Sequence, residues 1–167
     1  MWIIVDGYNV IRQWPDLAML DQAELRAGRD ALIQELRAYR QAKGHKVTVV
    51  FDGVEAGSFS ETQESAGGVA VRYSRRGETA DAVIARLAAE GGEGTIVVSS
   101  DREVLAAARR GRAAGLPAAE FIARLEAARL GTLKGGDAEE RPVKSGKGTA
   151  HRLPKSQRRA ERRLKDL

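Results

Sequence analysis

Three aspartates in this chain each follow a short apolar run. Asp6 follows Trp-Ile-Ile-Val, Asp52 follows Val-Thr-Val-Val-Phe, and Asp101 follows Thr-Ile-Val-Val-Ser-Ser. Such runs predict buried strands of a parallel sheet, and open α/β sheets carry their functional residues at the carboxyl ends of the strands. Three carboxylates at one sheet edge repel each other unless a cation lies between them. Hard oxygen ligands favour Mg²⁺ or Mn²⁺, so the pattern predicts a site for one of these metals.

Two further acids lie around the start of an expected helix. Glu78 precedes Thr79, a candidate N-cap, and Asp81 falls in the first helical turn. A structural interpretation stays open beside the chemical one, because the helix dipole favours Asp81 there without any metal. Likewise Asp101 is an ordinary N-cap residue type, and Asp52 precedes a glycine and suits a turn.

The chemistry that needs such an acidic group is phosphoryl transfer. A divalent cation held by two or three carboxylates lowers the pKa of a bound water and polarises a phosphate. Asn9, Ser99 and Ser100 lie next to the aspartates in sequence. We expect these three to orient a coordinated water or to hold the carboxylates in place.

Basic and aromatic residues near the acids suggest contacts to nucleic acid. Arg75 and Arg76 precede Glu78 and are expected to clamp a phosphate, with solvated surface as the alternative. Three aromatic residues are candidates for stacking on unpaired bases, with ordinary packing as their alternative. They are Tyr8, Trp14 and Phe59.

The apolar periodicity alternates between strands and helices. Strands are expected at about 2–6, 46–52, 69–73, 95–100 and 116–118, and helices at about 21–43, 80–90, 102–114 and 119–130. Residues 7–9 are expected to turn, Asp21 and Glu24 to form a capping box, Gly44 and Gly115 to end helices, and 53–68 to form a polar loop. This order predicts an α/β fold, a three-layer α/β/α sandwich around a parallel sheet.

Composition excludes several classes. The chain has no cysteine and two histidines, which rules out disulfides, thiolate zinc sites and histidine-rich metal clusters. No apolar stretch reaches the roughly 20 residues that cross a membrane, and no signal peptide is recognised, so a cytoplasmic protein is expected. No pattern indicates a dimer.

The basic charge lies in the tail. Residues 134–167 hold 11 of the 28 Lys and Arg residues but only 5 of the 23 Asp and Glu residues, so the preceding body is nearly neutral. We therefore expect a domain at 1–130 and a Gly-rich basic tail at 131–167, flexible or helical on binding. Such a tail points to a polyanion such as RNA, with a solubilising extension as the alternative. The expected RNA contacts in it are Arg158, Arg159, Arg162 and Arg163.

Four blocks resemble the NYN branch of the PIN-like nucleases, above all the YacP-type proteins, which include a ribosome-associated endoribonuclease. They read Val-Asp-Gly-Tyr-Asn-Val-Ile at 5–11, Val-Phe-Asp-Gly at 50–53, Glu-Thr-Ala-Asp-Ala-Val-Ile at 78–84 and Val-Ser-Ser-Asp-Arg at 98–102. The similarity runs from residue 1 to about 130 and implies a Rossmann-like sandwich. One departure is Leu-Pro-Ala-Ala after Gly115, which makes the last strand short or irregular.

The resemblance implies metal-dependent cleavage of RNA with Mg²⁺ or Mn²⁺. It assigns the central catalytic positions to Asp6, Asp81, Asp101 and Asn9, with Asp52 and Glu78 as further metal-site members and Ser100 in support. Single-stranded mRNA and the ribosome are the partners it implies. Arg102, beside Asp101 in the fourth block, joins the candidate RNA contacts.

Two other functions remain as alternatives. One is a catalytically silent RNA- or ribosome-binding module, although such a module has no need to crowd carboxylates near RNA. The other is a phosphatase or nucleotide hydrolase. An aspartyl-phosphate enzyme would want a second Asp two residues after Asp6, where Tyr8 stands, and no P-loop string occurs.

Overall fold

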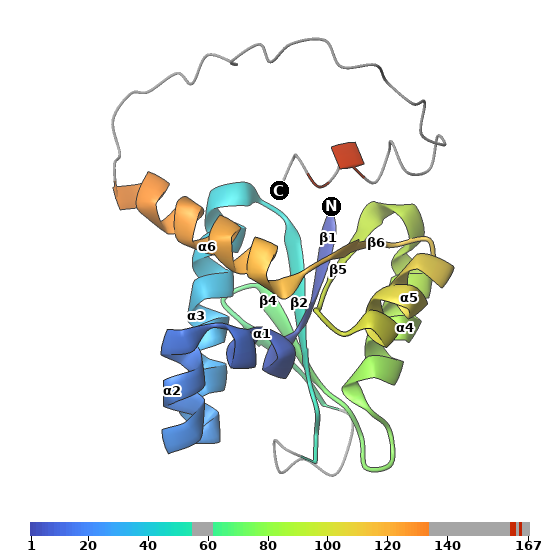
Figure 1. Cartoon of the computed structure of the whole chain (residues 1–167), viewed down its shortest axis with the longest axis horizontal. Helices are drawn as coiled ribbons and strands as arrows, with labels where there is room; N and C mark the ends of the chain where they lie inside the picture. The colour runs from blue at the N-terminus through green and yellow to red at the C-terminus, as the bar shows by residue number, and fades with distance from the viewer. Residues whose placement is uncertain (55–61, 134–160, 163, 165–167) are drawn as a thin grey trace.

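A six-stranded sheet lies between two layers of helices in the computed structural model of the chain, which describes residues 1–54, 62–133, 161–162 and 164 (Figure 1). The strand order is β3-β4-β2-β1-β5-β6, with β3 antiparallel to β4 and every other pair parallel. The strands are β1 Trp2–Asp6, β2 Lys46–Phe51, β3 Thr62–Ala66, β4 Val69–Tyr73, β5 Thr95–Val98 and β6 Ala114–Leu116. The helices are α1 Gly7–Gln13, α2 Pro15–Ala23, α3 Leu25–Lys43, α4 Ala80–Gly91, the short 3₁₀ helix η1 Gly92–Gly94, α5 Arg102–Arg110 and α6 Ala118–Leu133.

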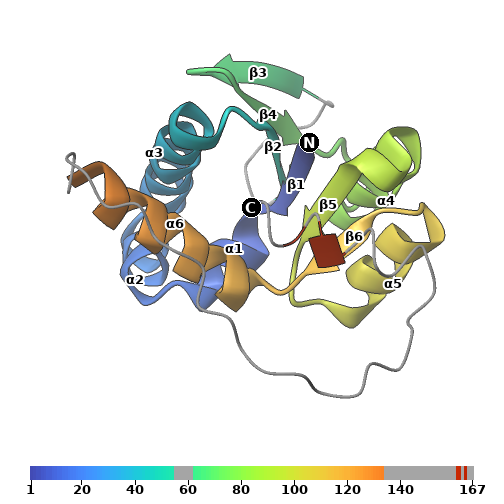
Figure 2. The same cartoon turned by 90° about the horizontal axis from the view of Figure 1, so that it is seen from above.

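Alternating side chains of the strands divide the core into two clusters, one on each face of the sheet. Ile3 and Val5 of β1 join the cluster under α1, α3 and α6, whereas Ile4 joins the cluster under α4 and α5. All three side chains are fully buried, and each such burial contributes about 1.5–3 kcal/mol. Seen from above, the two helical layers flank the sheet (Figure 2). The predicted three-layer α/β/α sandwich is confirmed.

The strand register brings the ends of the central strands to one edge. In the parallel pairing, Asp6 lies opposite Val50 of β2, and Val5 lies opposite Val98 of β5. Asp52 and Ser99 are therefore the first residues beyond the neighbouring strands, at the same edge as Asp6. This edge carries the candidate site.

The expected turn at residues 7–9 is wrong, because α1 begins at Gly7 directly after β1. Asp6 is the N-cap, and its side chain accepts a hydrogen bond from the Asn9 backbone N–H. A Cβ atom on Gly7 would lie 2.3 Å from a ring carbon of Phe51, so only glycine fits between strand and helix at this point. The abrupt strand-to-helix change thus depends on a close approach that local periodicity does not reveal.

The start of the long helix also differs from the prediction. Asp21 lies inside α2, and α3 begins after Glu24, whose side chain makes no capping hydrogen bond. The proposed capping box is therefore wrong. The end of this helix was predicted correctly, since Gly44 adopts a left-handed φ of 70° as its C-cap.

Three further boundaries are corrected. Strand β3 and its hairpin to β4 occupy part of the expected polar loop, whose residues 55–61 lie outside the described residues. Helix α5 ends at Arg110 with Gly111 as its cap, so Gly115 is a residue of β6 and not a helix end. The strand expected at 116–118 is β6 at Ala114–Leu116, and α6 continues beyond residue 130 to Leu133. In the part of the chain that the structure describes, no helix is both long and apolar enough to cross a bilayer.

Candidate active site

Asp6 lies at the base of the acidic edge, with only 8% of the residue exposed. Its Oδ2 accepts a hydrogen bond of 2.8 Å from the Ser99 hydroxyl, and its Oδ1 accepts one of 3.4 Å from the Asn9 N–H. The end of β1, the first turn of α1 and the end of β5 thus fix one carboxylate from three directions. A fixed carboxylate suits a metal ligand, because it loses little freedom on binding.

Burial raises the pKa of Asp6 from 3.8 to about 6. The hydrogen bonds from Ser99 and Asn9 oppose this change, while the negative charges of Asp81 and Asp101 add to it. The ionised form of Asp6 is therefore held in an unfavourable place. A nearby cation would remove that disadvantage.

Asp81 and Asp101 lie at the starts of two helices beside Asp6. Thr79 caps α4 by accepting from the Ala82 N–H, which puts Asp81 in the first turn. Asp101 caps α5, where its Oδ1 accepts from the N–H groups of Glu103 and Val104 at 2.7 and 3.3 Å. Both aspartates are exposed at the surface, above the buried Asp6.

The pKa of Asp81 is also raised. The causes are desolvation first and then the negative charges of Asp101, Glu103 and Asp52. Asp6, Asp81 and Asp101 are thus close enough to act on one another electrostatically, although they come from distant parts of the chain. Glu103, which was not among the predicted site residues, adds a further negative charge from the first turn of α5.

The acids do not form a ready-made metal cage. Across residues 1–54 and 62–133, together with the few described beyond them, no group of three His, Asp or Glu side chains is arranged to hold a metal ion. One oxygen of Asp101 is already engaged by two N–H groups. These acids nevertheless suit Mg²⁺ or Mn²⁺, which prefer carboxylate oxygens. The carboxylates repel one another, and that of Asp6 is buried.

Ser99 links two of the aspartates. Its hydroxyl donates to Asp6 and accepts a hydrogen bond of 3.1 Å from the Asp101 N–H, and the residue is fully buried. The serine therefore ties the carboxylate at the end of β1 to the N-cap of α5. The supporting role of Ser99 in catalysis stays a prediction.

A second network joins Asn9 to Ser100. The Asn9 Oδ1 accepts from the Ser100 N–H at 2.8 Å and from the Gln13 Nε2 at 2.9 Å. A backbone N–H only donates, so the Asn9 oxygen must face it, and the Nδ2 group remains the free donor among the described residues. The Ser100 hydroxyl donates to Gln13 Oε1 at 2.9 Å and accepts from the Ala118 N–H at 3.2 Å.

Gln13 is a site residue that sequence reasoning missed. It stands one helical turn after Asn9, a spacing that places both side chains on the same face of α1. The signal was available only once α1 was known to begin at Gly7. With residues 7–9 treated as a turn, no reason existed to pair the two amides.

Asp52 and Glu78 have different environments. Asp52 closes a turn after β2, where its Oδ1 accepts from the Val54 N–H at 2.9 Å, and its charge acts on Asp81. Glu78 lies between two arginines, with carboxylate-to-guanidinium distances of 3.5 Å to Arg75 and 3.0 Å to Arg86. The charge of Glu78 is thus already balanced in this arrangement.

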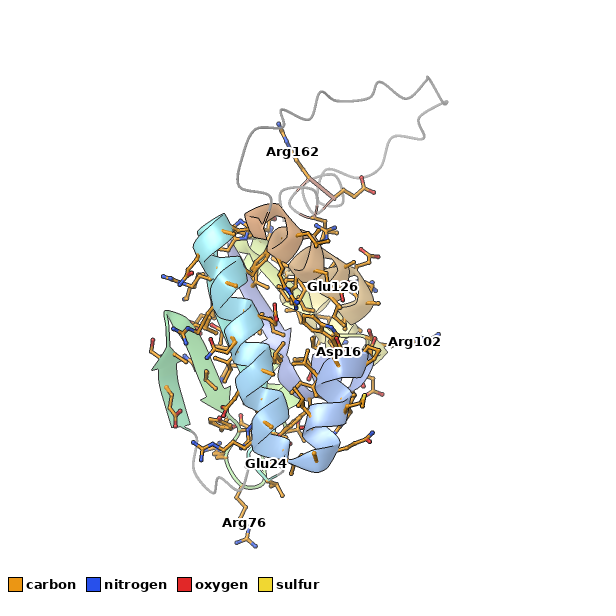
Figure 3. All side chains as sticks on the ribbon, turned by 90° about the vertical axis from the view of Figure 1, so that its left-hand side faces the viewer. Asp16, Glu24, Arg76, Arg102, Glu126 and Arg162 are labelled. Carbon is orange, nitrogen blue, oxygen red and sulfur yellow. The ribbon has the colours of Figure 1, made fainter. Side chains whose placement is uncertain are left out.

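The candidate RNA contacts fall into three groups. Arg75, Arg76, Arg102 and Arg162 are exposed, and Figure 3 shows the last three pointing away from the body. Tyr8 and Trp14 are only 4% and 5% exposed, so neither ring is free to stack on a base, contrary to expectation. The remaining candidates, Phe59, Arg158, Arg159 and Arg163, lie outside the described residues.

Comparison with known proteins identifies the family. The model of the YacP-like NYN domain matches residues 3–166. The chain belongs to this family. Uncharacterized protein YacP of Bacillus subtilis strain 168 is 37% identical over 86 residues, which make up 52% of this chain and 50% of that protein. The match thus spans about half the length of this curated relative.

The family has solved structures to which this chain is similar. Against the crystal structure of Rae1 (YacP) from Bacillus subtilis, the TM-score is 0.68 at 29% identity, covering 80% of this chain and 78% of that one. A mutant of the same protein gives a TM-score of 0.69 at 29% identity, covering 80% and 79%. This YacP-like chain therefore has a nuclease-like NYN fold.

Proposed function

We propose that this YacP-like protein is a metal-dependent endoribonuclease that hydrolyses phosphodiester bonds in single-stranded RNA, including mRNA on the ribosome. The observation that carries the proposal is the buried Asp6, whose pKa is raised to about 6 beside Asp81 and Asp101 on a nuclease-like fold. An ionised carboxylate in this place lowers the stability of the fold unless a cation binds beside it. A carboxylate whose pKa is strongly perturbed by burial and by neighbouring charges is common at functional sites.

Mg²⁺ or Mn²⁺ is the cofactor that these residues suit. Asp6, Asp81 and Asp101 would hold it, and the negative charge of Asp52 would strengthen its binding. Mg²⁺ usually keeps several waters and binds through one or two carboxylates and the phosphates of its substrate, so a complete cage need not exist beforehand. When bound, such an ion supplies an activated water and polarises the phosphate.

The neighbouring polar residues have positioning parts in this proposal. Ser99 keeps the Asp6 carboxylate in one orientation through its hydrogen bond. Asn9 is held through its oxygen by Ser100 and Gln13, so its Nδ2 can donate to a phosphate oxygen of the substrate. A donor that is fixed in advance stabilises developing charge without reorganisation.

The test is cleavage of an end-labelled single-stranded RNA, free and on ribosomes, with Mn²⁺ or Mg²⁺ and with chelator. Asp6→Asn should lower the cleavage rate at least about 100-fold, since one metal ligand is lost. Glu90→Gln is a matched carboxylate-to-amide control, because Glu90 is exposed in the last turn of α4, at the opposite end of that helix from Asp81. Full activity in the Asp6→Asn protein would end the proposal.

One observation favours a second candidate, a silent RNA- or ribosome-binding module. No ready metal-binding group exists among the described acids. The same assay separates the two functions. RNA binding without cleavage under either metal, and unchanged in Asp6→Asn, would favour the binding module.

A further inference from the structure

Arg29 is a half-buried cation outside the acidic site. It lies near the start of α3, and its Nη1 donates a hydrogen bond of 2.9 Å to the Tyr8 hydroxyl. Helix α3 leads into β2, so its first turns lie toward the carboxyl ends of the strands (Figure 1). Tyr8 stands two residues after Asp6 on α1. Arg29 is therefore at the same edge of the sheet as the acids, on the α3 side.

The tyrosine that holds Arg29 is itself fixed. The Tyr8 ring meets the Phe51 ring edge-on at a centroid distance of 5.2 Å, and Phe51 stacks on Tyr73 at 5.8 Å. Arg12 of α1 places its guanidinium carbon 5.6 Å from the centroid of the Tyr8 ring. Two arginines from different helices thus converge on one rigid aromatic residue.

The charge of Arg29 is not neutralised by an ion pair among the described residues. The adjacent Asp30 is engaged with Arg26 at 3.7 Å, one turn earlier on the exposed side of α3. Of the five guanidinium N–H groups of Arg29, one is used by Tyr8. A half-buried, pre-oriented guanidinium with further N–H donors is suited to a phosphate, whose oxygens match its planar fork.

We propose that Arg29, positioned by Tyr8 and assisted by Arg12, binds a backbone phosphate of RNA one or more nucleotides away from the cleaved bond. This inference rests on the proposed function. In this proposal Tyr8 positions Arg29 through its hydroxyl and does not stack on a base. It also sets the path of the strand, which crosses the sheet edge from the acids toward the start of α3.

Binding and cleavage can be separated to test this. Affinity for a labelled single-stranded RNA is measured in chelator, which prevents metal-dependent cleavage, over a series of salt concentrations. Arg29→Gln should weaken binding several-fold and reduce the slope of log K against log salt by about 0.7, the value for one phosphate on a single strand. Arg37→Gln is the matched control, because it makes the same charge change about two turns further along α3. It should leave the slope unchanged.

Two more variants test whether Arg29 contacts a phosphate or only supports the fold. Arg29→Lys should restore the slope, since the charge returns, but only part of the affinity. Tyr8→Phe keeps the ring packing, removes the hydroxyl and should weaken binding with little change in slope. A melting curve on each variant identifies any that fail to fold, and Arg29→Lys then replaces Arg29→Gln in the comparison with wild type.

The outcomes distinguish failure of the Arg29 phosphate site from failure of the proposed nuclease function. If the wild-type protein cleaves RNA and Arg29→Gln binds with unchanged affinity and slope, the phosphate site is refuted and the nuclease stands. If Arg29→Lys matches wild type in affinity as well as slope, the proposed fork geometry is refuted. If the wild-type protein neither binds nor cleaves RNA, both proposals fall.

Discussion

At the scale of single residues, the burial of Asp6 makes the stability of the fold depend on pH. Its pKa of about 6 in the folded protein exceeds the ordinary aspartate value of 3.8, so the folded state binds the proton more tightly than the unfolded state. The resulting stabilisation is fully present below the unfolded pKa and is lost as the pH rises through 6, up to about 3 kcal/mol. Asp6 ionised without a metal therefore strains the fold at neutral pH.

The expected result is that Asp6→Asn is more stable than wild type at pH 7 in chelator, by as much as about 3 kcal/mol. The advantage should shrink toward pH 4, where Asp6 is protonated in the folded state and, close to its ordinary pKa of 3.8, partly protonated in the unfolded state. Urea unfolding between pH 4 and 7 measures the difference. Adding Mn²⁺ should raise the stability of wild type only. A less stable Asp6→Asn protein at pH 7 would contradict the burial argument.

Asn9 makes a second residue-scale prediction. Asn9→Asp keeps an oxygen for the Ser100 and Gln13 donors but loses the Nδ2 donor. Cleavage should fall about 100-fold, the usual cost of one fixed donor to developing charge, while the melting temperature changes little. Gln22→Glu on the exposed surface of α2 adds the same charge and serves as control. Equal rates for the two variants would remove Asn9 from the site.

The sequence predicted the aspartates better than their surroundings. Asp6 could be found because it ends β1, and Asp101 because it follows β5 by three residues, and strand ends meet at one edge. Gln13 could not be found, since its pairing depends on where α1 begins. The burial of Tyr8 was equally hidden, because it results from the Phe51 ring of a distant strand.

At the scale of elements, the junction between β1 and α1 positions the site. Gly7→Ala would place a Cβ atom 2.3 Å from the Phe51 ring and so push strand and helix apart. Overpacking of this kind costs about 1–3 kcal/mol and should lower both the melting temperature and the cleavage rate. Gly94→Ala is the control, because its Cβ would meet no atom within 4 Å. Similar melting temperatures for the two variants would show that the junction tolerates change.

The elements that were predicted well carry strong apolar periods of their own. Strands β1 and β2 belong to this group, whereas the end of α3 was predicted from its C-cap Gly44. Strand β3 is polar and pairs only at the sheet edge, so its sequence has no strand signal apart from its partner β4. The end of α5 was misplaced because Gly115 has the residue type of a helix cap, whereas in the fold it packs against Leu105.

At the scale of the whole molecule, a nearly neutral body carries a strongly basic tail. The family match continues through that tail to residue 166. The described part of it contacts the body, since Arg124 donates to the Leu164 carbonyl and Leu164 packs against the core cluster. The described tail residues therefore lie against α6, and the RNA contacts expected in the tail stay a prediction.

Truncation after Leu133, where α6 ends, tests whether the tail binds RNA while the body folds without it. The melting temperature should fall only slightly, because Leu164, half-buried, is the one described tail residue that packs against the core. RNA affinity should drop and its salt dependence should become shallower, since each lost phosphate contact removes about 0.7 from the slope. Changing Arg158, Arg159, Arg162 and Arg163 to Gln keeps the length of the chain and isolates the charge. If that variant binds RNA with the wild-type slope, the tail acts as a spacer and the RNA is held by the body alone.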